Sequence, residues 1–145
     1  MAGPKAAIPW TLVGGLPIVR NCMDTRVLTV SAEMDILEAI RFLLKNRVTG
    51  APVVDEQRRL VGILSEKDCL KLLTTGHAGE VPQGSVKEFM STDPTVIAPE
   101  TDLYFVAGLF LKSTFRRLPV VEEDGTLVGA ITRFDILRVI HENVP

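Results

Sequence analysis

One polar sequence occurs twice in this chain, and this repeat constrains the fold more than any other feature. The stretch 60–68, Leu-Val-Gly-Ile-Leu-Ser-Glu-Lys-Asp, recurs at 127–135 as Leu-Val-Gly-Ala-Ile-Thr-Arg-Phe-Asp. A shift of 67 residues, the separation of Gly62 from Gly129, aligns 17–71 with 84–138 without a gap. A copy of about 60 residues is too small to be trusted as an independent core. We therefore expect the two repeats to fold together.

Composition indicates a soluble globular chain of 145 residues, 46% hydrophobic and 23% charged. The formal net charge of −2 gives no general field that would attract nucleic acid or an anionic membrane. Cys22 and Cys69 align with Phe89 and Ile136, so we interpret both as small core residues in a reducing cytoplasm. Residues 1–16 form an apolar, proline-interrupted arm that fits neither a signal peptide nor a membrane span.

Within each repeat the hydrophobic period changes in the order strand, helix, strand, strand, helix. A lead-in helix is expected before each first strand, at 18–23 and at 85–90. The glycine-rich stretch 74–84 is expected to be a linker between repeat 17–73 and repeat 85–141, and 142–145 a tail. The five elements are predicted at 27–30, 35–46, 51–54, 60–64 and 66–73 in the first repeat, and at 95–97, 102–113, 118–121, 127–131 and 133–141 in the second.

Three features carry a family resemblance: this order of elements, the Pro-Val-Val strands, and the Gly-x-hydrophobic-Ser/Thr-x-x-Asp sequence that opens each last helix. Together they resemble a tandem pair of cystathionine beta-synthase (CBS) domains, often called a Bateman module. The resemblance covers about residues 17–141. It implies an α/β (α+β) fold in which the two repeats pack with pseudo-twofold symmetry and leave two clefts. In that family such clefts commonly hold AMP, ADP or ATP, and sometimes S-adenosylmethionine.

The repeated Ser65-x-x-Asp68 and Thr132-x-x-Asp135 have two interpretations. A hydroxyl three residues before an acid is close to a capping box, which starts many helices regardless of function. Alternatively, each aspartate accepts hydrogen bonds from the two ribose hydroxyls, and each Ser or Thr hydroxyl donates to a phosphate at the helix start. We also expect the preceding glycine to let the backbone approach a ligand. The duplicated context favours the ligand, with Asp68 and Asp135 as ribose binders.

A phosphate also needs positive charge, and the repeats differ in its supply. Arg116 and Arg117 precede the second Pro-Val-Val strand, where the first repeat has uncharged residues. The resemblance implies phosphate contacts for both arginines, or else they complement a helix end in solvent. Lys67 and Arg133 are further candidates, with exposed helix surface as the alternative. We therefore expect one cleft to bind a phosphorylated adenosine well and the other weakly or not at all.

The stretch 103–111 of the predicted helix 102–113 is apolar on every side, so this helix needs a second covered face. The resemblance implies a homodimer through such helical faces, in which Gly108 would permit close approach. The alternative is that the arm containing Trp10 covers the face.

Catalysis has little support, because His77 and His141 have no companions at metal-ligand or catalytic spacing. The functional hypothesis is a regulatory module that binds an adenosine ligand and signals by conformational change to a separate, unidentified protein effector in the cytoplasm. It predicts no nucleic acid, membrane or metal partner. The alternative is a ligand-free structural or protein-interaction module.

Overall fold

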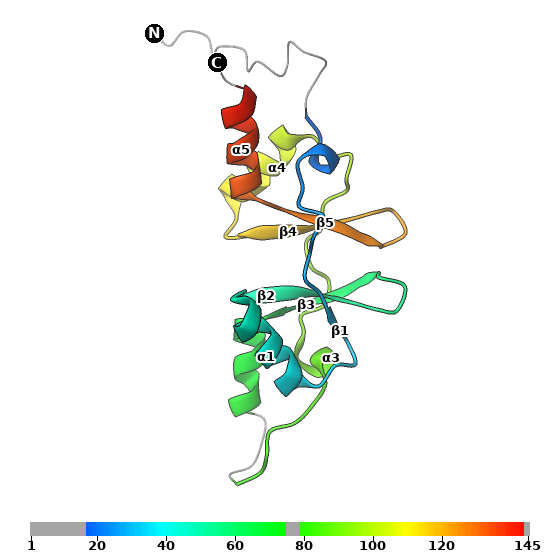
Figure 1. Cartoon of the computed structure of the whole chain (residues 1–145), viewed down its shortest axis with the longest axis vertical. Helices are drawn as coiled ribbons and strands as arrows, with labels where there is room; N and C mark the ends of the chain where they lie inside the picture. Colours follow the sequence, from blue (N-terminus) through cyan, green and yellow to red (C-terminus); the bar gives the residue numbers. More distant parts are fainter. Residues whose placement is uncertain (1–16, 75–78, 144–145) are drawn as a thin grey trace. The chain divides into compact units, whose positions relative to one another are not determined.

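The computed structural model describes residues 17–74 and 79–143, which form two compact units (Figure 1). The first-repeat unit contains the described residues of 27–95 together with 124–127, and the second-repeat unit contains those of 1–26, 96–123 and 128–145. The arm with Trp10, His77 of the linker, and residues 144–145 lie outside the described residues.

The first-repeat unit contains a three-stranded sheet in the order β1-β2-β3. β1 (Val30–Ser31) is parallel to β2 (Gly50–Val54), and β2 is antiparallel to β3 (Leu60–Ser65). The helices are α1 (Ile36–Asn46), α2 (Glu66–Leu70) with the 3₁₀ turn η3 (Lys71–Leu73), and α3 (Val86–Phe89). Asp35 caps α1 by accepting hydrogen bonds from the amides of Leu37 and Glu38, so the acidic helix start indicated by the sequence is confirmed.

The second-repeat unit contains a two-stranded sheet of β4 (Arg117–Val121) and β5 (Leu127–Thr132). Its helices are α4 (Leu103–Lys112), α5 (Arg133–Asn143) and the 3₁₀ turn η2 (Val19–Asn21). Both units bury aliphatic side chains between sheet and helices, where burial contributes about 25 cal/mol per Å² of apolar surface. Fully buried examples are Ile36 and Leu64 in one unit and Leu118 and Ile131 in the other.

The strand predicted at 95–97 is wrong, because only Ile97 makes a parallel bridge, to Val120. In the first repeat the matching bridge continues to a second pair, Ser31 with Val54. A parallel ladder would need the next amide to come from residue 99. That residue is proline, which has no N–H to donate.

The lead-in segments are exchanged between the repeats. The amide of Val19 donates to the carbonyl of Thr101 at 2.8 Å, and the amide of Val86 donates to the carbonyl of Met34 at 2.9 Å. Matching ion pairs support both connections, Arg20 with Glu100 at 2.7 Å, and Lys87 with Glu33 at 3.2 Å. Each lead-in therefore belongs to the unit built mainly from the other repeat, and neither repeat supplies all of its own unit.

The outer face of α4 is only partly covered within the described chain. Leu103, Val106 and Phe110 are buried, whereas Phe105 is 58% exposed and Leu111 is 87% exposed. This pattern agrees with the two apolar faces indicated by the sequence, of which one packs on the core. Separately, none of the described helices is long and apolar enough to cross a membrane.

Candidate functional site

Asp68 lies at the start of α2, where it forms a capping box with Ser65. The Ser65 amide donates to Asp68 Oδ2 at 2.9 Å, and the Ser65 hydroxyl donates to the same oxygen at 2.9 Å. In return the Asp68 amide donates to Ser65 Oγ at 3.1 Å. The capping interpretation of this sequence is thus correct as local structure, and it orients the carboxylate.

Asp135 has the same arrangement at the start of α5. The Thr132 amide and hydroxyl donate to Asp135 Oδ2 at 2.8 and 3.1 Å, and the Asp135 amide donates to Thr132 Oγ1 at 3.2 Å. The hydroxyl accepts one hydrogen bond and donates another. It can therefore redirect its proton to a ligand without losing the bond that caps the helix.

Both aspartates are buried, with only 6% of each residue exposed. A buried carboxylate needs a charge partner or several hydrogen-bond donors. Lys71 Nζ donates to Asp68 Oδ1 at 3.3 Å, and Arg138 Nη2 donates to Asp135 Oδ1 at 3.0 Å. Two negative charges are thus held beneath the surface, each with a cation three residues later on the same helical segment.

Sequence reasoning missed Lys71, Arg138 and Ser91. The repeat alignment carries the signal for the first two, because Lys71 and Arg138 occupy equivalent positions. Ser91, which follows α3, donates from Oγ to Asp68 at 3.2 Å for Oδ1 and 3.4 Å for Oδ2. At the other site the lead-in connection is different, since Arg138 Nη2 donates to the Cys22 carbonyl at 3.2 Å. The exchange of lead-in segments creates both contacts.

The motif glycines have a different neighbour from the expected ligand. A Cβ at Gly129 would lie 2.6 Å from Met23 Sδ and 2.9 Å from the Asp24 carbonyl oxygen. At Gly62 the corresponding distances are 2.7 Å to Met90 Sδ and 2.8 Å to the Ser91 carbonyl oxygen. The glycines therefore admit the lead-in backbone, which forms antiparallel bridges at the next residue of β3 and β5.

The predicted phosphate cations lie on the exposed surface. Arg116 directly precedes β4, Arg117 begins it, and Lys67 is in the first turn of α2. None of these three forms an ion pair with another described residue. Arg133, next to Thr132, lies over the ring of Phe110 at 5.9 Å from the centroid. Arg133 therefore has a cation–π partner already.

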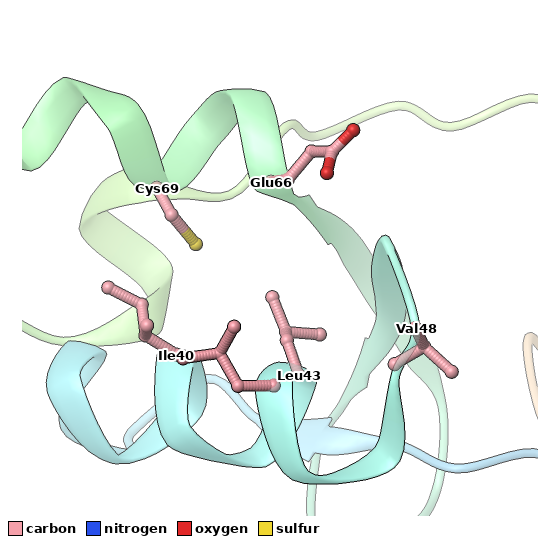
Figure 2. A pocket seen from close by; sticks show the side chains of 6 residues that line it. Ile40, Leu43, Val48, Glu66 and Cys69 are labelled. Carbon is pink, nitrogen blue, oxygen red and sulfur yellow. The ribbon is translucent and has the colours of Figure 1, made fainter.

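A small cavity of about 130 Å³ lies between α1 and α2 (Figure 2). Figure 2 shows the Cys69 side chain pointing toward Ile40 and Leu43 across it. Burial raises the pKa of the Cys69 thiol, which keeps it protonated and weakly nucleophilic. In the second repeat, phenylalanines occupy the positions of Leu43 and Val48. The lining residues are Ile40, Leu43, Leu44, Val48, Glu66 and Cys69.

In the described ranges, 17–74 and 79–143, no three His, Cys, Asp or Glu side chains gather as a metal site would require. The two buried carboxylates instead have hydrogen-bond donors, including one cation each. They present an anionic acceptor that suits a ligand with hydroxyl groups.

Comparison with known proteins gives the same family for both repeats. A model of the CBS domain matches residues 19–75 and 86–142. The CBS domain-containing protein CBSX1, chloroplastic, of Arabidopsis thaliana is 32% identical over 140 residues, which cover 79% of this chain and 58% of that protein. This chain thus spans little more than half of that relative.

Solved structures agree on the fold. The crystal structure of CBSX2 in complex with AMP has a TM-score of 0.74 at 33% identity, covering 86% of this chain and 96% of that one. The CBS domain pair of protein MJ0100, in complex with 5-methylthioadenosine and S-adenosyl-L-methionine, has a TM-score of 0.69 at 25% identity and covers 89% and 99%. These matches confirm the mixed helix and strand fold with two tandem repeats.

Proposed function

This chain belongs to the CBS domain family, and we propose that it is a regulatory module that binds an adenosine ligand at its motif aspartates. The observation that carries the proposal is the pair of buried carboxylates, each held by a hydroxyl that can turn to a phosphate. Similar CBS pairs bind AMP, or 5-methylthioadenosine and S-adenosylmethionine. These ligands share an adenosine with two vicinal ribose hydroxyls.

The chemistry fits the ribose first. An ionised carboxylate accepts only, so it suits two neighbouring hydroxyl donors, and charge-assisted bonds of this kind are stronger than neutral ones. Burial increases the effect because water competes less at a site of low dielectric. Asp135 and Asp68 are the two candidate ribose binders in this proposal, with AMP, ADP, ATP or S-adenosylmethionine as the candidate ligands.

Phosphate recognition favours the second repeat. Thr132 opens α5, a helix of 11 residues whose amino-terminal dipole end attracts an anion. Arg116 and Arg117 lie in the same unit and form no ion pair with described residues, and Arg133 adds a third positive charge. The phosphate contacts predicted on the first repeat are Ser65 and Lys67. The Asp135 site is therefore the stronger one for a phosphorylated ligand.

A thermal-shift panel tests the binding. The protein is unfolded and refolded to remove carried ligand, then mixed with AMP, ADP, ATP, S-adenosylmethionine or GTP as the non-adenosine control. A ligand at a hundredfold excess over its Kd adds about 2.7 kcal/mol of stability, which moves the Tm by several degrees. We expect a shift with at least one adenosine ligand and none with GTP.

Two variants separate ligand binding from helix capping. Asp135→Ala removes the proposed ribose acceptor together with the carboxylate half of the α5 capping box, the acceptor of the Thr132 amide. Asp102→Ala removes only the α4 cap, since Asp102 accepts from the Phe105 amide at 2.9 Å. Each variant should lose about 1 kcal/mol of stability, but only Asp135→Ala should lose the ligand-induced shift. A shift that survives in Asp135→Ala would contradict the proposal.

The signal is a conformational change that a separate protein effector reads, and the module acts as a homodimer through its helical faces. The exposed side chains of Phe105 and Leu111 on α4 and Phe134 on α5 support such contacts, because apolar groups at 58%, 87% and 72% exposure gain free energy on burial. A solution mass of two chains by light scattering is expected. A monomer at every concentration tested would remove the dimer.

The same exposed residues support a second candidate, a protein-interaction module without a ligand. In that case no adenosine ligand would shift the Tm, whereas Phe134→Ser would still weaken self-association or partner binding. The panel therefore decides between the two candidates.

A further inference from the structure

The two motif carboxylates differ in how many hydrogen bonds they already accept. Asp68 Oδ2 accepts from the Ser65 amide and hydroxyl, and Oδ1 accepts from Lys71 and from the hydroxyl of Ser91. Asp135 Oδ2 likewise accepts from the Thr132 amide and hydroxyl, but Oδ1 accepts from Arg138 alone among the described residues. The difference is the serine hydroxyl.

Counting acceptor positions shows what this difference means for a ribose. A carboxylate offers about four lone-pair positions. When the Ser65 or Thr132 hydroxyl turns to a phosphate, one position on Oδ2 becomes available at each site. Asp135 then has two open positions, one on each oxygen, which matches a vicinal diol. Asp68 has one, so a diol must also displace Ser91 or Lys71.

We propose that the Ser91 hydroxyl closes the first-repeat site to ribose, so that the chain binds one adenosine ligand, at Asp135. This inference rests on the proposed function and identifies a specificity residue outside the repeated motif. Lys71 is the weaker obstacle, because its side chain is 55% exposed on a flexible stem and can swing away from Asp68 into solvent. The backbone of Ser91 is paired with Ile63 of β3, which keeps its short side chain within reach of Asp68.

The second site lacks this hydroxyl because an aspartate, Asp24, occupies the position equivalent to Ser91. Ser91 exchanges two hydrogen bonds with Ile63, both of 2.9 Å, and Asp24 exchanges two with Ala130, of 2.9 and 3.0 Å. Positions 24 and 91 are therefore equivalent both in the repeat alignment and in the structure. The Asp24 side chain accepts from the Arg26 amide at 2.9 Å and, as a carboxylate, has no proton to donate to Asp135. A serine at position 24 would have the same reach toward Asp135 that Ser91 has toward Asp68.

Titration calorimetry with AMP on the refolded full chain tests the inference by stoichiometry. The wild type should bind one AMP per chain, and Ser91→Ala should bind a second, with at least about tenfold higher affinity than the wild-type first-repeat site, as expected for removing one competing hydrogen bond. Ser91→Thr keeps a hydroxyl and should bind one. The reciprocal change, Asp24→Ser, should weaken the Asp135 site about tenfold.

The controls separate the hydroxyl from other effects. Asp24→Ala removes the same carboxylate without adding a hydroxyl, so it should not weaken AMP binding. Thermal unfolding without ligand checks that each variant is folded. One AMP bound in the wild type and in Ser91→Ala alike, with binding abolished by Asp135→Ala, would overturn this inference and leave the proposed function standing. No binding of AMP, ADP, ATP or S-adenosylmethionine by either protein would overturn both.

Discussion

Gly129 lies where the lead-in backbone crosses β5, and a methyl group there tests whether that crossing stabilises the protein. In Gly129→Ala the new Cβ would lie 2.9 Å from the Asp24 carbonyl oxygen and 2.6 Å from Met23 Sδ. The sulfur belongs to a flexible side chain and can move. The carbonyl is backbone and can retreat only by breaking the bridge between Asp24 and Ala130.

The expected loss follows from that bridge. Its two hydrogen bonds, of 2.9 and 3.0 Å, are worth about 1 kcal/mol each, and forcing a methyl group into packed space costs about 1 to 3 kcal/mol. Because the shift that relieves the clash also breaks the bonds, the two costs overlap. We expect Gly129→Ala to lower the free energy of unfolding by about 2 to 3 kcal/mol.

Urea unfolding followed by circular dichroism measures the change, with the midpoint moving and the slope unchanged. Gly108→Ala is the matched control, because nothing lies within 4 Å of its Cβ position in the interior of α4. That variant should gain about 0.5 to 1 kcal/mol from helix propensity. A Gly129→Ala protein within about 0.5 kcal/mol of wild type would refute the view that the crossing is tightly packed.

Two other predictions concern the cavity between α1 and α2 and the thiol of Cys22. Val48→Phe, which copies the second repeat, should fill part of the cavity between α1 and α2. A denaturant titration should then show a free energy of unfolding about 0.5 to 2 kcal/mol higher than that of the wild type. A lower free energy of unfolding would mean that the cavity walls cannot accept a ring. Burial raises the pKa of the Cys22 thiol, so the neutral thiol stabilises the fold at lower pH, and this contribution is lost as the pH rises through the raised pKa. Cys22→Ala should therefore flatten the alkaline fall of stability measured by thermal unfolding, and an unchanged slope would show that other groups cause it.

Local patterns predicted most elements because they depend on neighbours in the sequence. The predicted helices 35–46 and 102–113 differ from α1 and α4 by one residue or less at each end, since an aspartate N-cap and apolar spacing act within a few residues. The Thr95–Ile97 strand failed for a cause that was also in the sequence. Pro99, one residue beyond Ala98, ends the ladder that Ala32 allows in the first repeat.

The same reasoning could predict only part of the candidate site. Asp68 and Asp135 could be selected because they recur in register within a repeated motif. Ser91 could not, because it lies 23 residues from Asp68 and directly after the lead-in assigned to the other repeat. The contact of the motif glycines with the lead-in backbone was missed for the same reason, since periodicity and propensity carry no information about which segment lies against a strand.

The exchanged lead-ins also determine when each unit can form on the ribosome. Most of the first-repeat unit comes from one continuous stretch of chain, Val27–Thr95, so its core can assemble while the rest is still being made. The segment carrying Val19 emerges before Val27–Thr95, yet its partner Thr101 emerges some 80 residues later than Val19. During synthesis that apolar segment waits without its native neighbours, and the loop it must close is among the longest in the molecule. The segment around Val19 is thus among the last of the described parts to reach its place.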